Sequence, residues 1–279
     1  MSMVINTNVA SLASQRHLSS SRAEMEQAME RLSSGKRINS AMDDAAGLTI
    51  SHSLDSKIAG LNQAVRNAND GIALVNLAEG ALEEISSMLV RMKELATQGA
   101  NGTYNTTTDL PAIGAEYDAL VAEITRVSDN TKFNGIAVIG GSSTATFQLG
   151  DTSTDTISVT FQEMNAGSGL SLTATYASAT KTTAAYDTPT DAITEIDAAI
   201  ATVDSYRSTL GAAANRMEHA ASNLMTRVEH QSAARSRIQD ADYAVESANL
   251  AKAQVLQQAG TAMLSQANAS TQNVLSLLK

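Results

Sequence analysis

The sequence predicts a mainly α protein, built as a long antiparallel helical bundle or coiled coil from its N- and C-terminal segments, with a small β-hairpin region in the middle of the chain. Two widely separated segments repeat apolar residues at every seventh position, the pattern of helices packed side by side. The 279-residue chain has no Trp, three Phe and eleven Met, so its core must depend on aliphatic side chains and Met. Its two Pro leave room for long unbroken helices.

The first apolar repeat begins at Val75 and has three parallel stripes. The third stripe widens the apolar face beyond a two-stranded seam, so we expect this helix to contact more than one neighbour, and a bundle is favoured over a simple dimer. The stripes are Val75, Leu82, Leu89 and Ala96; Ala78, Ile85, Met92 and Gly99; and Leu74, Ala81, Met88 and Leu95.

The second repeat lies in the C-terminal third. Turn-rich sequence separates the two repeats, so an antiparallel pair is the simplest arrangement. Asp191 stands before the second helix as a start signal, although Thr190 or Thr188 could cap it equally well. The candidate bundle-core residues of the two repeats are Val75, Leu82, Ile85, Leu89, Ile196, Val203, Leu210, Met217 and Leu224.

Two further helical stretches, at about 4–32 and 45–65, precede the first repeat. Residues 33–40 between them contain Ser, Gly and Asn, which break a helix, so a joint is predicted there. Asp43 and Asp44 follow at a place where negative charge favours the start of a helix.

The middle of the chain has the residue pattern of β-strands in place of helical repeats. Short β-type runs separated by glycine-containing turns predict hairpins within about 133–176, and the Ser-, Thr- and Ala-rich residues 177–190 are predicted to be an exposed connection. The runs are 136–139, 146–149, 156–161 and 170–176.

Both ends of the chain lack charged side chains. Residues 2–15 and 253–278 contain no Asp, Glu, Lys or Arg, although the formal net charge of the chain is -10. Neither has the ~18 consecutive apolar residues that a membrane span needs, so we expect the ends to be buried against other protein. The candidate assembly residues are Val4, Ile5, Val9, Leu12, Val255, Leu256, Met263, Leu264, Val274, Leu275, Leu277 and Leu278.

Composition and motifs argue against several functions. The acidic balance, with a pI of about 4.8, argues against nucleic acid or an anionic membrane as a partner. The absence of Cys removes disulfides and thiolate sites, and His219 and His230 would lie ~16 Å apart along one helix, too far for one metal ion. No catalytic motif is found, so we predict a protein that is not an enzyme and has no cofactor or metal. No cleavable secretory signal is visible.

Several segments resemble the signatures of bacterial flagellins. They are residues 31–48 (RLSSGKRINSAMDDAAGL), 60–71 (GLNQAVRNANDG), 78–85 (AEGALEEI), 232–238 (SAARSRI), 253–260 (AQVLQQAG) and 273–279 (NVLSLLK). The resemblance covers roughly the first half and the last third of the chain. It implies a terminal domain of residues 1–43 and 239–279, which lines the inner tube of a flagellar filament, and a shell domain of residues 44–238. The short middle implies a minimal form without large outer domains.

The resemblance also implies partners and a location. They are further copies of the chain in a helical filament, a cap protein, hook–filament junction proteins, an export chaperone and an animal Toll-like receptor, which would face Arg91, Leu95 and Glu116. Export through the flagellar type III apparatus to the extracellular filament is implied. The alternatives are a hook–filament junction protein and, from another class, a coiled-coil binding module or adhesin, which would not explain the charge-free ends.

Overall fold

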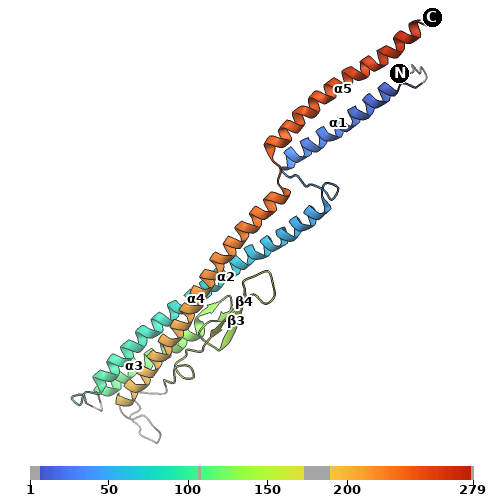
Figure 1. The fold of residues 1–279 in the computed structure, drawn as a ribbon. Helices are drawn as coiled ribbons and strands as arrows, with labels where there is room; N and C mark the ends of the chain where they lie inside the picture. The colour runs from blue at the N-terminus through green and yellow to red at the C-terminus, as the bar shows by residue number, and fades with distance from the viewer. Residues whose placement is uncertain (1–6, 106–107, 173–188, 278–279) are drawn as a thin grey trace. The chain divides into compact units, whose positions relative to one another are not determined.

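The computed structural model describes residues 7–105, 108–172 and 189–277, and its elements are shown in Figure 1. They are α1 (Val9–Ser34), α2 (Ala45–Gly99), α3 (Asp109–Asn130), β1 (Lys132–Phe133), β2 (Ile136–Ala137), β3 (Ser143–Gln148), β4 (Thr156–Phe161), α4 (Pro189–Gln239) and α5 (Tyr243–Leu277). Long helices therefore dominate, with small antiparallel β pairs in the middle of the chain, and the predicted fold class is confirmed.

The chain divides into two compact units. Unit 1 contains residues 1–58 and 229–279, and unit 2 contains residues 59–228. α2 and α4 each continue without a break through the places where these units divide, and the domain boundaries expected at 43/44 and 238/239 stay a prediction. The predicted stretch 45–65 and the first repeat also belong to one helix, α2.

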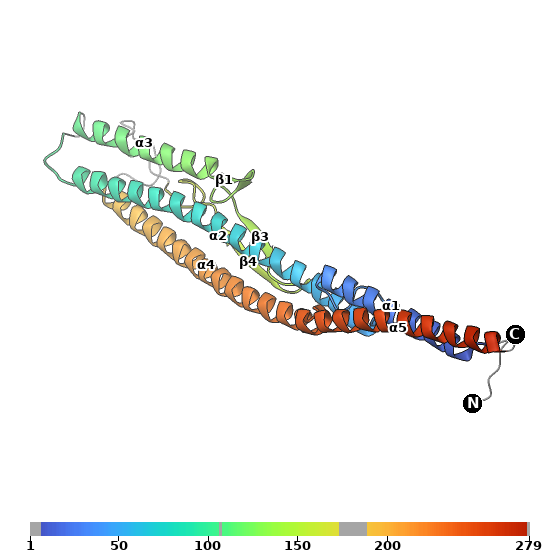
Figure 2. The same ribbon diagram turned by 90° about the horizontal axis from the view of Figure 1, so that it is seen from above.

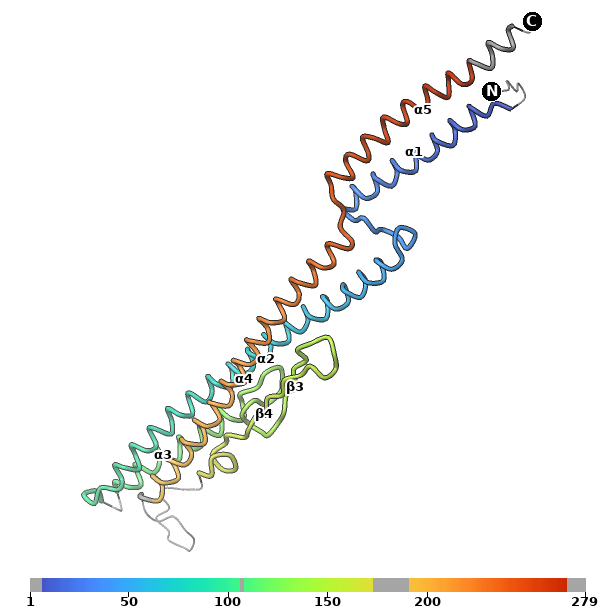
Figure 3. Tube along the Cα trace, in the orientation of Figure 1, coloured from blue at the N-terminus to red at the C-terminus, as the bar shows by residue number. Residues whose placement is uncertain are grey.

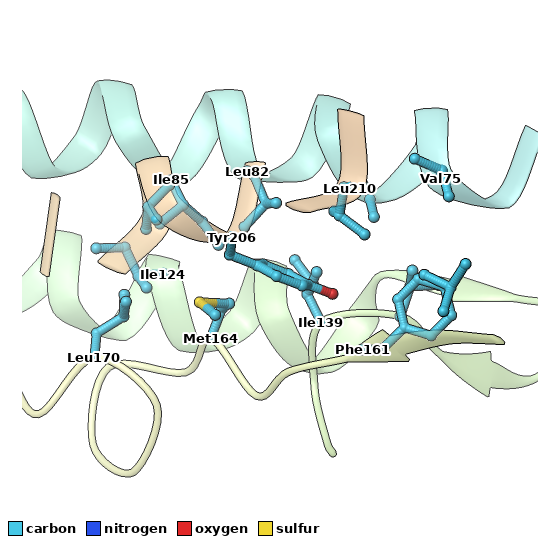
Figure 4. Packing of buried hydrophobic residues seen from close by; sticks show 14 of the residues in the cluster. Val75, Leu82, Ile85, Ile124, Ile139, Phe161, Met164, Leu170, Tyr206 and Leu210 are labelled. Atoms are coloured by element: carbon cyan, nitrogen blue, oxygen red, sulfur yellow. The ribbon is translucent and has the colours of Figure 1, made fainter. Parts of the chain in front are cut away.

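Unit 2 is organised around the first and second repeats. The nine candidate bundle-core side chains are each at most 2% exposed. Figure 4 shows Leu82 and Ile85 of α2 above Ile124 of α3, with Tyr206 and Leu210 of α4 among them. Figure 2 shows α3 and α4 both running alongside α2. The second neighbour expected from the third apolar stripe is therefore present, and it is α3.

Two antiparallel hairpins complete unit 2. β1 pairs with β2 across Asn134 and Gly135, and β3 pairs with β4 from Ser143↔Phe161 to Gln148↔Thr156. Val159 and Phe161 of β4 are buried in the core, whereas Ser and Thr side chains occupy the opposite, exposed face. The alternation of apolar and hydroxyl residues therefore matches the pleat of the strands.

Two sequence-based expectations were wrong in detail, and one helix was not predicted. The run 170–176 is not a strand over its described residues, 170–172, although Leu170 and Leu172 are buried. Asp191 does not precede α4, because that helix begins at Pro189, a residue suited to the first helical position. Helical spacing in α3, with Ile113, Tyr117 and Ile124 buried, was not recognised from the sequence.

Candidate functional site

In unit 1, α1 and α5 lie side by side and run in opposite directions (Figure 3). The side chains buried between them are small, including Ala28 and Ala253, each 2% exposed. Near the ends of the pair, the Asn8 amide Nδ2 donates to the Ala267 carbonyl at 3.0 Å. The Ser11 hydroxyl donates to the Asn268 Oδ1 atom at 2.9 Å. Small and polar residues thus hold the two helices together.

The larger apolar side chains of this pair remain exposed. Of the candidate assembly residues, those with described side chains are between 42% and 68% exposed, except for Leu264, which is half-buried. The exposed ones are Val9, Leu12, Val255, Leu256 and Met263. Val4, Ile5, Val274, Leu275, Leu277 and Leu278 lie outside the residues whose side chains the structure describes. Several exposed apolar side chains on one helix pair make this pair a candidate for a protein–protein contact.

Formal charge is divided unequally between the units. Unit 1 carries ten basic and ten acidic residues, whereas unit 2 carries nine basic and nineteen acidic residues. All of the excess negative charge therefore belongs to unit 2. Close packing of unit 1 against copies of itself meets no net repulsion, because its own formal charge is zero.

A joint connects the helices of unit 1. α1 ends at Ser34 and is capped by Gly35, whose φ of 70° is left-handed and whose N–H donates to the Arg31 carbonyl. Backbone hydrogen bonds then join the segment between α1 and α2 to the junction of α4 and α5. Arg37 N donates to Gln239 O at 2.6 Å, and Ala241 N donates to Gly35 O at 2.9 Å. Ile38 is 2% exposed, so this joint is a packed structure.

Arg31 is the central side chain of the joint. Its Nη1 atom donates to Glu246 Oε1 at 3.1 Å, and its Nη2 atom lies 3.9 Å from Asp43 Oδ1. The Glu246 side chain is 9% exposed and that of Arg31 is 23% exposed, so the pair is largely shielded from water. Sequence analysis did not find this pair, because the two residues are 215 positions apart and no local pattern links them.

Asp43 completes the joint. Its Oδ2 atom accepts hydrogen bonds from the backbone N–H groups of Ser40 at 2.9 Å and Asn39 at 3.2 Å, and its Oδ1 atom accepts one from Gln27. These donors, the Ser40 N–H first, hold the pKa of the Asp43 carboxyl below its ordinary value. Asp44 caps the start of α2 by accepting from Gly47 N at 2.9 Å, in the place where its charge was expected.

The candidate receptor-facing residues separate into two kinds. Arg91 of α2 donates from Nε and Nη2 to Glu116 of α3, at 2.9 and 2.8 Å, and both side chains are 49% exposed. The hydrogen bonds from Arg91 to Glu116 raise the pKa of the Arg91 guanidinium. Leu95 is 2% exposed and packs in the core of unit 2, so the expectation that it faces a receptor is corrected. It belongs to the third apolar stripe, whose function is packing.

No site for metal chemistry is found among the described residues. Within the described ranges no three His, Cys, Asp or Glu side chains group closely enough to hold a metal ion. All four His side chains are exposed. None of the helices, over the residues described, is both long and apolar enough to cross a membrane.

Comparison with known proteins identifies the family. Residues 5–144 match the bacterial flagellin N-terminal helical region, and residues 193–278 match the bacterial flagellin C-terminal helical region. Flagellin of Halalkalibacterium halodurans is 42% identical over 99% of this chain and 100% of its own length. The chain belongs to the flagellin family. Flagellin of Bacillus subtilis is also 42% identical, over 99% of this chain and 100% of its own.

A crystal structure of Bacillus cereus flagellin is 32% identical, covering 57% of this chain and 88% of that one, with a TM-score of 0.48. As a flagellin, the chain is a structural subunit of the bacterial flagellar filament. The full-length matches to flagellins favour this role over that of a hook–filament junction protein. The 279-residue length fits a minimal form of the family.

Proposed function

We propose that the exposed apolar side chains of the α1–α5 pair form the surface through which the chain joins its filament. The supporting observation is that Val9, Leu12, Val255, Leu256 and Met263 are exposed on a unit with no net charge. Full burial of such a side chain contributes ~1.5–3 kcal/mol, so completing the burial of a half-exposed one contributes roughly 1 kcal/mol. The five together stabilise an added subunit substantially.

In this proposal unit 1 supplies the inner tube of the filament and unit 2 supplies the surrounding shell. Copies add through unlike surfaces whose rotation does not close, which gives an open helical tube in place of a ring. The net negative charge of unit 2 suits the outer shell, where water and counterions screen repulsion between neighbours.

The ends are proposed to order only on assembly. Mainly small side chains are buried between α1 and α5, so the isolated pair gains little apolar burial to offset its conformational entropy. Hydrogen exchange should find residues 7–15 and 253–269 unprotected in the free subunit and protected in filaments. Strong protection in the free subunit would contradict this.

Such ends would also suit export as an extended chain through the flagellar type III apparatus and the channel of the filament. A chaperone that covers the apolar ends before export, junction proteins at the base and a cap protein at the tip are the further partners proposed. Each would contact the same apolar segments, because those segments are what an unassembled subunit exposes.

The experiment that tests the assembly proposal is electron microscopy after seeding purified chain with short filament fragments. Full-length chain should extend the seeds, and chain lacking residues 1–15 and 253–279 should not. A variant with Leu256→Asp and Met263→Asp should also fail, whereas Glu218→Asp, on an exposed position of unit 2, should extend the seeds normally. Normal extension by the trimmed chain would refute the proposal.

A second proposed activity is recognition by a flagellin-sensing Toll-like receptor. The exposed Arg91–Glu116 pair supports it, and the burial of Leu95 limits the expected contact to the charged residues. Since a filament neighbour and a receptor would compete for this face, free subunit should activate a reporter cell line and cross-linked filament should do so poorly. Equal activity of the two would refute the shared surface.

A further inference from the structure

The hairpin between β1 and β2 turns at an Asn-Gly pair. Asn134 has a φ of 48° and Gly135 a φ of 82°, so both turn residues are left-handed, the pattern of a type I′ hairpin. The pairing is short, with only Lys132↔Ala137 and Phe133↔Ile136 in register. Figure 2 shows β1 directly after the end of α3. A hairpin of two residues per strand has little stability of its own.

The base of this hairpin is fixed, and its tip is free. Val138 N donates to Thr131 O at 3.1 Å, and the Ser128 hydroxyl donates to the Ile139 carbonyl at 2.7 Å, with both Val138 and Ile139 fully buried. In the part of the chain that the structure describes, neither the Asn134 side chain nor Gly135 N makes a hydrogen bond. A Cβ built on Gly135 would meet nothing within 4 Å.

We propose that Asn134–Gly135 is a site of spontaneous deamidation. Gly135 N loses its proton to solvent and attacks the Asn134 Cγ atom. The new N–Cγ bond closes a five-membered succinimide, the bond from Cγ to the amide nitrogen breaks, and ammonia leaves with a proton from water. Addition of water at Cγ breaks the N–Cγ bond and gives aspartate with a normal backbone, and addition of water at the main-chain carbonyl breaks the bond from that carbon to Gly135 N and gives isoaspartate. In both cases Gly135 N takes back a proton from water. No oxidant or reductant is needed.

Three features of the site favour this reaction. Gly135 has no side chain to obstruct the ring, its N–H is exposed to the base that must deprotonate it, and no hydrogen bond holds the carboxamide of Asn134. Ring closure needs rotation about the backbone bonds of Asn134. A hairpin with only two residue pairs in register permits this rotation by local opening. Buried neighbours do not obstruct the rotation, because both turn residues are exposed.

The chain contains a matched comparison at Asn101–Gly102. There the Asn101 Oδ1 atom accepts from Thr103 N at 3.3 Å, Asn101 N donates to Gln98 O at 3.1 Å, and the Asn101 carbonyl accepts from Tyr104 N at 3.3 Å. Both Asn residues precede Gly, so they share the local chemistry. The structure restrains Asn101 with three hydrogen bonds, and we therefore expect it to convert more slowly.

The two products have different consequences. The aspartate product adds one negative charge and can keep the left-handed turn, since Asp tolerates that conformation. Isoaspartate routes the backbone through the side-chain carbons and inserts a methylene into the turn. Because the base at Val138 is fixed, the extra length must be absorbed in the hairpin, and the pairing of Phe133 with Ile136 should be lost.

The test is peptide mass spectrometry on the purified full-length chain during incubation in mildly alkaline buffer, native and in concentrated urea. In urea both Asn residues should convert at similar rates. In the native protein Asn134 should convert several-fold faster than Asn101, and conversion should slow in mildly acidic buffer because Gly135 N must lose a proton. Asp-specific cleavage separates the products, because it cuts before Asp and leaves isoaspartate intact.

Two variants complete the test. Asn134→Gly accepts the positive φ and has no side-chain amide, so the conversion at this position should disappear while that at Asn101 is unchanged. Asn134→Asp should keep the amide protection of residues 133–137, whereas the isoaspartate product should lose it. An Asn134 that stays unconverted while Asn101 reacts, or a native ratio equal to that in urea, would overturn the proposal.

Discussion

Replacing Arg31 with Ala should weaken the joint of unit 1 far more than the same change at Arg22. Both residues lie on α1 and both contact a Glu. The Arg22–Glu26 pair has side-chain exposures of 70% and 60%, whereas those of Arg31–Glu246 are 23% and 9%. Removal of Arg31 takes away the cation that pairs with the Glu246 carboxylate, and the carboxylate stays shielded from water.

The size of the effect follows from these exposures. Breaking a buried pair costs ~3–5 kcal/mol, and the partial exposure of Arg31 places its loss near ~3 kcal/mol. An exposed pair four residues apart on a helix contributes ~0.3–0.5 kcal/mol. The difference of about 2.5 kcal/mol corresponds to a roughly 70-fold change in the equilibrium for local opening.

Hydrogen exchange in seeded filaments is the suitable assay, because α1 and α5 are expected to be paired there. Protection of the amides of residues 246–253 should fall by about this factor in Arg31→Ala and little in Arg22→Ala. The double variant Arg31→Ala with Glu246→Gln should recover part of the protection, since it also removes the uncompensated charge. Equal losses in Arg31→Ala and Arg22→Ala would refute the reasoning.

Three further predictions concern the core, the acid response and the end of α1. Leu82→Ala should lower the free energy of unfolding of unit 2 by ~3–5 kcal/mol in urea titrations, because Leu82 is 0% exposed, whereas Leu77→Ala, at a side chain 38% exposed, should cost less than about 1 kcal/mol. The folded protein lowers the pKa of Asp43 from 3.8, so the stability that its carboxylate contributes is present above pH 3.8 and is lost as the pH falls through the lowered pKa. Amide protection at the joint should therefore fall in acid. In Asp43→Asn this acid-dependent loss of protection should disappear. Gly35→Ala should destabilise the end of α1 by ~1 kcal/mol because of its φ of 70°, measured by amide protection in filaments, whereas Gly80→Ala, in open space within α2, should be neutral or stabilising.

The local features of the fold could be predicted from the sequence where one physical signal governs them. The heptad stripes of α2 and α4 depend only on helical periodicity, and burial in the structure follows the same stripes. The break after α1 depends on Gly35, whose left-handed conformation few other residues adopt. α3 has the same seven-residue spacing, from Tyr117 to Ile124, but its 22 residues hold too few repeats to stand out as a sustained stripe.

The sequence by itself determined the helical fold class, the family, the charge-free ends and the apolar positions of the repeats, because each of these depends only on residue type and on spacing along the chain. Only the tertiary structure decided which distant residues meet. It paired Arg31 with Glu246, buried Leu95 in the core while leaving Arg91 exposed, and left the Asn134 side chain free while restraining Asn101. The physical reason is that periodicity specifies which side of a helix is apolar, whereas contacts and exposure depend on the neighbours that folding brings to each side.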